Sequence, residues 1–241
     1  MLSIIIPMFN EEKTIFGLLE SIFLSLQDSE IAFEIVVVND ASTDASKFEV
    51  QQLNRSELKL VNLETNMGKG HAVQIGIENS IGDVIVVQDA DNEYSPSDLP
   101  KMFHAFEHAL VPSAIYGSRA QGASIHLLGW RQFLRIWPRQ GVLPWAFNRL
   151  LSLYFFLFTR KYVSDLLTGY KMYPRSLFDY WTPSTSGFET DHEISMKIIG
   201  LGIAIKEVPV FYSPRSKSEG KKIKTSDAFK AIRTIYRFRK S

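Results

Sequence analysis

Four short apolar runs rich in β-branched residues divide the first part of the chain, at 2–7, 34–38, 58–63 and 83–88. Runs of this length are typical of buried strands and are too short for most helices. The intervening segments show helical spacing, as in the series Ile15, Leu18, Leu19, Ile22 and Phe23. Strands that alternate with helices predict right-handed βαβ units. We therefore expect an α/β fold with a mostly parallel central sheet flanked by helices.

Polar residues follow each predicted strand. They are Asn10 and Glu11, the segment 39–44, the segment 66–70, and Asp89, Asp91 and Glu93. In open α/β sheets, chemistry gathers at the carboxyl ends of the strands. Two carboxylates spaced as in Asp89-Ala90-Asp91 can converge on a hard cation such as Mg²⁺ or Mn²⁺, which could hold a diphosphate. The alternative is that these acids only cap the next helix or solvate a turn.

Two common nucleotide-binding patterns are absent. The segment Gly68-Lys69-Gly70 lacks the spaced glycines and the Lys-Ser/Thr ending of a P-loop. No GxGxxG fingerprint follows a predicted strand, which argues against a dinucleotide-dependent dehydrogenase. Gly68-Lys69-Gly70 could itself be an ordinary turn with a solvated lysine.

Composition sets the broad limits. A chain of 241 residues, 45% of them hydrophobic, can bury one sizeable core. We expect a single domain over 1–241, with a first half at 1–98, a second half at 99–212, and a basic loop and C-terminal helix at 213–241. The net charge of +1 argues against a surface that is basic throughout, and the absence of cysteine excludes disulfides and thiolate metal sites.

The apolar segments predict no transmembrane helix. Residues 2–7 lack a basic leader and read as a strand, not as a signal peptide. The most apolar candidate, 150–159, is too short to span a bilayer and is flanked by Arg149, Arg160 and Lys161. It predicts a buried or interfacial helix. We expect a cytoplasmic protein attached peripherally to the cytoplasmic face of a membrane.

Four motifs in the first half carry a family resemblance: IIPMFNE at 5–11, VNDASTD at 38–44, NMGKG at 66–70 and DAD at 89–91. In order and spacing they resemble the inverting family 2 glycosyltransferases of the GT-A fold. YGSR at 116–119, DLLTGYKMY at 165–173, GFE at 187–189 and the basic stretch from Arg215 look like the branch that glycosylates polyprenyl phosphates, of which dolichyl-phosphate mannose synthase is the best-known type.

The resemblance implies that 1–98 is the half that binds the nucleotide-sugar donor and that 99–212 is the half that binds the acceptor. Pro7, Asn10 and Glu11 match the first nucleotide-binding loop, Gly68 and Lys69 match a loop near the nucleotide, and Asp40 matches the acid that hydrogen-bonds the base. A carboxylate can accept from the imide N–H of uracil or guanine, so UDP- or GDP-sugars are favoured. Asp89 and Asp91 match the metal-binding pair, with Glu93 as a further ligand where mannose synthases tend to carry glutamine.

The binding site for the acceptor phosphate needs cations more than a general base. A phosphate monoester has a second pKa of about 6 and is already largely dianionic at neutral pH. Arg119, Arg215, Lys221 and Lys222 could bind such a phosphate or the diphosphate. Asp165 is expected at the site, so the predicted catalytic set is Asp89, Asp91, Asp165 and Arg119. Three further acids, Glu189, Asp191 and Glu193, could be structural or could include a base.

Two segments suggest lipid contact. Residues 126–159 combine Trp, Phe and Arg, which suits the headgroup level of a membrane, although part of this set could be core. Relatives commonly carry an asparagine where we align Phe156, while Asn148 lies nearby. Residues 213–241 are strongly basic, as a loop over the diphosphate followed by a helix facing anionic lipid, or simply as a solvated helix end.

These features predict an inverting, metal-dependent transferase that moves one hexose from a UDP- or GDP-sugar to a polyprenyl (dolichyl or undecaprenyl) phosphate at a membrane surface, with no nucleic-acid partner. A second hypothesis keeps the donor half but transfers to a saccharide or protein hydroxyl, with Asp191 or Glu193 as base. A third is an inactive nucleotide-binding or membrane-scaffolding protein.

Overall fold

A computed structural model describes residues 1–121, 142–179, 181–215 and 225–239. It contains a seven-stranded sheet in the order β3-β2-β1-β4-β6-β5-β7. The strands are β1 (Leu2–Met8), β2 (Phe33–Asn39), β3 (Leu58–Asn62), β4 (Val84–Val87), β5 (Ser113–Ser118), β6 (Lys171–Pro174) and β7 (Ala204–Pro209). The four apolar runs identified in the sequence form β1 to β4, and the predicted α/β fold is confirmed.

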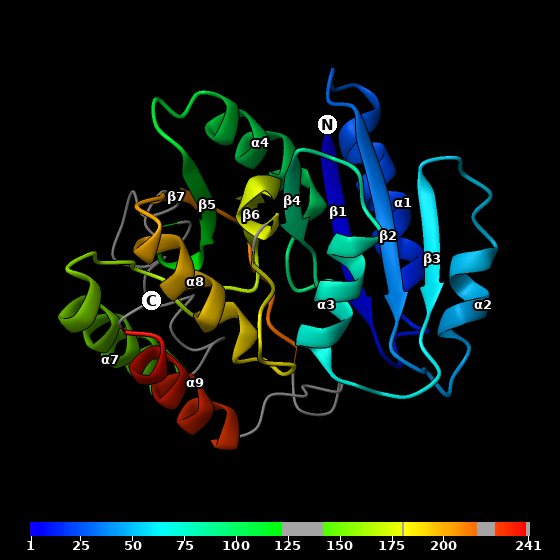
Figure 1. Ribbon diagram of the computed structural model, residues 1–241. Helices are drawn as coiled ribbons and strands as arrows, with labels where there is room; N and C mark the ends of the chain where they lie inside the picture. Colours follow the sequence, from blue (N-terminus) through cyan, green and yellow to red (C-terminus); the bar gives the residue numbers. More distant parts are fainter. Residues whose placement is uncertain (122–141, 180, 216–224, 240–241) are drawn as a thin grey trace.

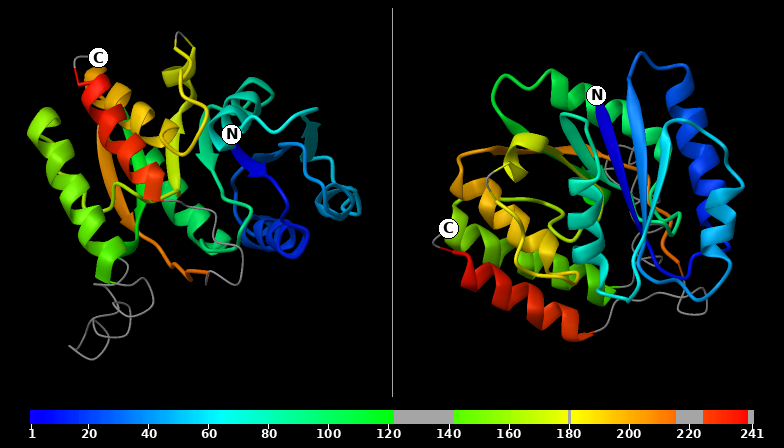
Figure 2. Two further views of the ribbon diagram at one scale, coloured as in Figure 1. Left: turned by 90° about the horizontal axis from the view of Figure 1, so that it is seen from below. Right: turned by 45° about the vertical axis from the view of Figure 1, so that its right-hand side comes forward.

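Helices cover both faces of the sheet (Figures 1 and 2). One face carries α1 (Ile15–Gln27), α2 (Ser46–Gln51) and α4 (Leu99–Glu107), which follows the short turn η1 (Pro96–Asp98). The other carries α3 (Lys69–Glu78), α7 (Val142–Thr159), α8 (Thr190–Gly200) and α9 (Thr225–Arg237), while η2 (Arg175–Phe178) follows β6. Because each helix buries an apolar stripe on the sheet, the result is a three-layer sandwich.

Successive side chains of β1 point to opposite faces of the sheet, so the strand is buried on both faces. Ile4 and Ile6 pack into the cluster beneath α1 and α4, whereas Ile5 packs into the cluster beneath α3. A strand buried on both faces needs apolar residues at successive positions, which is why it reads as a continuous run. Among the helices of the described segments, none has the length and apolarity that crossing a membrane requires.

Two features of the topology position the site. The chain leaves β1 toward β2 on one side, while β4 pairs with β1 on the other, so a crevice forms at their carboxyl ends. The strand β6 runs antiparallel to both β4 and β5, with Lys171 opposite Val87. Because β6 is reversed, the residues that precede it reach the same edge of the sheet as the residues that follow β4.

Candidate active site

A cavity of about 850 Å³ lies at this carboxyl edge. Most of the predicted site residues line it: Pro7, Glu11, Asp40, Gly68, Lys69, Asp89, Asp91, Glu93, Arg119 and Arg215. Two predicted residues lie behind the wall instead: Asn10 accepts a hydrogen bond from the Thr43 amide at 2.8 Å, and Asp165 lies behind Arg119. Lys221 and Lys222 fall outside the described residues. The cavity therefore joins the predicted donor and acceptor residues in one space.

Each of the first four strands leaves the sheet through a residue in the left-handed region. These are Asn10 after β1 (φ 52°), Ala41 after β2 (58°), Gly68 after β3 (95°) and Asn92 after β4 (59°). Glycine adopts this region at little cost and asparagine tolerates it, whereas alanine is strained there by about 1 kcal/mol or more. Polar residues that line the cavity lie next to each of these turns: Glu11, Asp40, Lys69, Asp91 and Glu93.

Asp40 connects two of these turns. Its side-chain oxygens accept hydrogen bonds from the backbone amides of Met67 at 2.8 Å and Gly68 at 2.9 Å. The carbonyl of Asp40 also accepts from the Asn66 side chain at 3.2 Å. Although Asp40 is buried, it still lines the cavity, so it fixes the loop after β3 at the cavity wall.

The acids after β4 are paired with cations of the protein. Lys69 Nζ lies 2.6 Å from Asp89 Oδ1, and Arg215 Nη2 lies 3.0 Å from Asp91 Oδ2. Burial alone would lower the pKa of Lys69, but the charges of Asp89 and Asp191 raise it above its ordinary value. Burial, together with the nearby charges of Asp89 and Glu93, raises the pKa of Asp91 to about 6. Asp91 is thus a buried carboxylate that lies beside two other acids.

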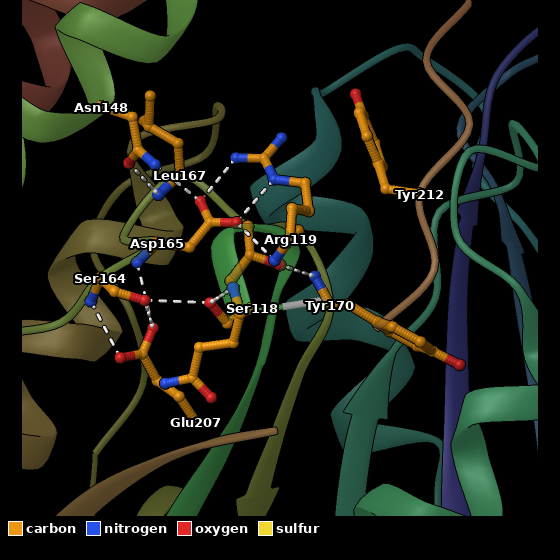
Figure 3. A network of polar contacts seen from close by, with 12 residues as sticks. Ser118, Arg119, Asn148, Ser164, Asp165, Leu167, Tyr170, Glu207 and Tyr212 are labelled. Carbon is orange, nitrogen blue, oxygen red and sulfur yellow. Dashed lines mark hydrogen bonds and ion pairs between the residues drawn. The ribbon is translucent and has the colours of Figure 1, made fainter. Parts of the chain in front are cut away.

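Arg119 lines the same cavity and is fixed by a buried network (Figure 3). Its Nε and Nη2 donate to the two oxygens of Asp165, each at 2.7 Å, and its backbone amide donates to the same carboxylate at 2.9 Å. Burial would raise the pKa of Asp165, but the charge and hydrogen bonds of Arg119 hold it below its ordinary value. This fork-to-fork pair presents the guanidinium to the cavity in one orientation.

Asn148 and Glu207 support that pair from behind. Asn148 on α7 donates to Asp165 Oδ1 at 2.9 Å and accepts from the Leu167 amide at 3.2 Å. Glu207 on β7 accepts from the amides of Ser164 at 2.9 Å and Asp165 at 3.0 Å. The side chain of Phe156, at the position aligned with asparagine in relatives, is exposed on the outer side of α7. The polar contact at Asp165 is therefore made by Asn148.

The three acids near the start of α8 have different surroundings. Glu193 is buried and accepts hydrogen bonds from the amides and hydroxyls of Ser184 and Thr185, between 2.6 and 2.9 Å. Glu189 lies 4.0 Å from Lys230. Only Asp191 of these three lines the cavity. Glu193 holds a loop, whereas Asp191 is placed where it can meet a substrate.

Three aromatic side chains were not anticipated from the sequence. The ring of Tyr212 lies 4.9 Å from the Arg119 guanidinium carbon, and the ring of Phe188 lies 5.6 Å from Lys69 Nζ. The hydroxyl of Tyr94 accepts from the Gly169 amide at 3.1 Å. Phe188 lies within the GFE motif, which was a usable signal. Tyr94 and Tyr212 lack a recognisable pattern, because their roles arise from contacts between distant segments.

The acidic cluster suits a divalent metal ion in its chemistry. Glu11, Asp89, Asp91 and Glu93 supply hard oxygen donors, and the structure pairs Asp89 with Lys69 and the other three acids with Arg215. Within the described ranges, no three acidic or histidine side chains already converge as a metal site. The ion pairs explain this arrangement, because each cation draws its carboxylates toward itself.

Comparisons with known proteins agree with this geometry. Residues 3–181 match the model of the family described as Glycosyl transferase family 2. A dodecaprenyl-phosphate galacturonate synthase of Rhizobium johnstonii is 32% identical over 63% of the chain and 42% of its own length. A dolichol-phosphate mannosyltransferase of Pyrococcus furiosus is 27% identical over 99% of the chain and 63% of its own length. The chain therefore spans only part of each relative.

Solved structures show the same architecture. A glucosyl-3-phosphoglycerate synthase of Mycobacterium tuberculosis, solved with Mg²⁺ and UDP, matches with a TM-score of 0.66 at 19% identity, over 98% of this chain and 78% of that one. The same enzyme has also been solved with Mn²⁺ and UDP. Since the family model matches most of the chain and the GT-A fold is shared, the chain belongs to glycosyltransferase family 2.

Proposed function

We propose that the protein transfers one hexose, with inversion, from a UDP- or GDP-sugar to a polyprenyl phosphate. The observation that carries this proposal is the pairing, in one cavity, of an acidic end at Asp89 and Asp91 with a fixed arginine at Arg119. The relatives whose names specify dodecaprenyl or dolichol phosphate support the acceptor class.

The donor would lie over the carboxyl ends of β1 to β4. Asp40 would accept from the base, Lys69 would face the diphosphate, and Asp89 and Asp91 would hold Mg²⁺ or Mn²⁺. Such an ion supplies Lewis-acid stabilisation of the leaving diphosphate. Glu93 accepts hydrogen bonds from the 212–215 segment through both of its side-chain oxygens, so we assign it the further role of holding this segment, argued below.

The acceptor phosphate would lie against Arg119. One of its oxygens attacks the anomeric carbon, the bond from that carbon to the diphosphate breaks, and the electron pair leaves with the diphosphate. A dianionic phosphate has no proton to lose at this step, so no general base is needed. Asp165 serves to hold the guanidinium in place, and direct displacement gives the β-linked product from an α-linked donor.

The outer surface of α7 and α9 supports a membrane-bound acceptor. Leu150, Leu153 and Leu157 are exposed along one stripe of α7, and Phe229, Ile232 and Tyr236 are exposed at the same spacing on α9. The two helices meet where the rings of Phe158 and Tyr236 lie 6.1 Å apart. Basic residues flank both stripes: Arg149, Arg160, Lys161, Arg233 and Arg237. Apolar stripes beside cations suit an anionic lipid surface.

The decisive experiment is transfer of labelled sugar from UDP-glucose, UDP-galacturonate or GDP-mannose to undecaprenyl or dolichyl phosphate, with Mn²⁺ or Mg²⁺. Label should move into an organic-extractable product with the parent protein. Arg119→Lys should reduce transfer by at least about 100-fold, because it removes the bidentate fork. Asp91→Ala should abolish metal-dependent donor binding in calorimetry. Absence of transfer across the donor and acceptor panel, despite donor binding, would refute the proposal.

Transfer to a hydroxyl group is the second candidate, because Asp191 lines the cavity and could serve as a base. The variant Asp191→Asn distinguishes transfer to a lipid phosphate from transfer to a hydroxyl group. It should leave transfer to lipid phosphate within about tenfold of the parent, whereas a hydroxyl acceptor would lose roughly 100-fold or more. Glu193→Gln is not a useful discriminator, since Glu193 holds the Ser184–Thr185 loop.

A further inference from the structure

The guanidinium of Arg215 lies among three carboxylates of the candidate metal site. Its Nη1 is 3.0 Å from Glu11 Oε2, its Nη2 is 3.0 Å from Asp91 Oδ2, and its Nε is 4.0 Å from Glu93 Oε1. The remaining aspartate, Asp89, is paired with Lys69. Asp89 and Asp91, the two proposed metal ligands, are thus already neutralised in part by cations of the same chain.

The backbone at Arg215 is held by Glu93 and not by the ion pairs with Glu11 and Asp91. Arg215 N donates to Glu93 Oε1 at 2.9 Å, Ser213 N donates to the Glu93 carbonyl at 2.8 Å, and the Tyr212 hydroxyl donates to Glu93 Oε2 at 2.6 Å. Tyr212 also forms an antiparallel bridge with Tyr94. The guanidinium can therefore change partners by rotation of its side chain while Glu93 keeps the backbone in place.

The present partners do not satisfy the whole group. Arg215 Nε is buried and has no hydrogen-bond acceptor within reach among the described atoms. An ion bound between Asp89 and Asp91 would compete with the guanidinium for Asp91 Oδ2, since both need the same lone pairs. A diphosphate in the cavity would offer new oxygens to the same arginine, whose planar fork suits phosphate.

We infer that Arg215 is an exchangeable cation of the donor site. Before the donor binds, its guanidinium neutralises Glu11 and Asp91. When a divalent ion takes Asp91, the guanidinium turns to the donor diphosphate, and Glu93 anchors the backbone throughout. Metal and nucleotide therefore bind cooperatively, because the metal releases the arginine that the diphosphate needs. This inference rests on the proposed nucleotide-sugar donor.

The test is calorimetry of the intact protein with Mn²⁺ alone, and with UDP or GDP in saturating Mn²⁺, without any acceptor. Arg215→Met should bind Mn²⁺ about tenfold more tightly than the parent, because a competing positive charge is gone. The same variant should bind the nucleotide about tenfold more weakly, because a charged phosphate contact is lost. Arg215→Lys should keep the competition with Mn²⁺ but lose most of the nucleotide affinity.

Lys230→Met is the matched control. Lys230 also lines the cavity, but it lies 4.0 Å from Glu189 and Asp227 and is not placed on the metal acids. It should leave the Mn²⁺ affinity unchanged within about twofold. Amide hydrogen exchange gives a second readout: Arg215 N–H should stay protected when Mn²⁺ and nucleotide are added, because Glu93 continues to hold it.

The outcomes separate the two proposals. If the parent protein binds neither nucleotide with Mn²⁺, both the proposed nucleotide-sugar donor and the proposed exchange of partners by Arg215 are refuted. If the parent binds the nucleotide but Arg215→Met weakens Mn²⁺ and nucleotide alike, or leaves the Mn²⁺ affinity unchanged, the exchange alone is refuted. Loss of protection at the Arg215 amide on adding Mn²⁺ would also contradict it. Circular dichroism of Arg215→Met confirms that the variant is folded.

Discussion

Asp165 shows how one buried carboxylate can fix a functional cation. It is 1% exposed and is bonded to Arg119 and Asn148. Asp165→Asn leaves the Arg119 charge without its partner in the interior, so the free energy of unfolding should fall by about 3–5 kcal/mol. Sugar transfer should fall by at least about 100-fold, since Arg119, the proposed binding residue for the acceptor phosphate, loses its orientation.

Urea denaturation and the transfer assay check this expectation. Asp83→Asn is a suitable control, because the Asp83 side chain is 87% exposed and pairs only at the surface with the N-terminal amine. Its effect on stability should stay below about 1 kcal/mol. Wild-type stability and transfer in Asp165→Asn would show that Arg119 is positioned by other contacts.

Because His192 is buried, we predict that the free energy of unfolding falls in acid. Burial and the nearby charge of Lys171 lower the pKa of His192 to about 3. The unfolded chain, with a pKa of about 6.5, therefore takes up a proton that the folded chain refuses. Stability should fall as the pH drops from about 6.5 toward 3, by up to roughly 1.4 kcal/mol per pH unit from this group.

His192→Gln removes this proton uptake. Urea denaturation at several pH values should show a shallower loss of stability below about pH 6.5 than in the parent. His108→Gln, at the exposed end of α4, is the matched control. An unchanged pH slope in His192→Gln would mean that other groups account for the acid sensitivity.

At the scale of single elements, α3 is docked through a glycine. A Cβ at Gly70 would meet the carbonyl carbon of Ser186 at 2.7 Å and the oxygen of Gly187 at 2.8 Å, and would come still closer to the Thr190 hydroxyl. Because two of these atoms are backbone, Gly70→Ala should destabilise the fold by about 1–3 kcal/mol. It should also weaken nucleotide binding, since α3 begins at Lys69.

Gly17→Ala provides the opposite case within a helix. Gly17 lies on the exposed side of α1, and a Cβ there meets no atom within 4 Å. This change should stabilise the protein by up to about 1 kcal/mol through helix propensity. Chemical denaturation of both variants tests the contrast, and equal effects would show that α3 is not packed as closely as described.

The outer stripe of α7 predicts vesicle binding. Leu153→Glu places a charge in the middle of the proposed lipid-facing surface, so flotation with anionic vesicles should recover several-fold less protein. Leu24→Glu is the control, because Leu24 is 65% exposed on α1, on the opposite face of the sheet. Both changes should alter stability by no more than about 0.5 kcal/mol. Equal vesicle binding of Leu153→Glu and the parent would contradict the membrane surface.

At the scale of the whole molecule, β4 and β6 join the two halves into one sheet. We therefore expect residues 1–98 and the residues that follow them to unfold together. All four tryptophans lie between residues 130 and 181, so fluorescence reports on the second half, whereas far-UV circular dichroism reports on both. The two denaturation midpoints should coincide. An earlier fluorescence transition would show that the halves are separate cooperative units.

The first four strands and the polar groups at their exits could be predicted from the amino-acid sequence. The boundaries of β1 to β4 differ from the predicted runs by no more than one residue at either end, and the acids after β4 line the cavity. These features depend on local patterns, namely apolar continuity in a strand and turn residues at its end. The order of the motifs also predicted the family, and the comparisons confirm that prediction.

The tertiary structure alone decided which charges meet. Arg215 contacts Glu11 across 204 positions of sequence and Asp91 across 124. The choice of Asp191 over Glu193 as the acid on the cavity wall, and of Asn148 as the partner of Asp165, likewise follows from packing. Local periodicity contains no information about such pairs, because they exist only once distant segments have been brought to one edge of the sheet.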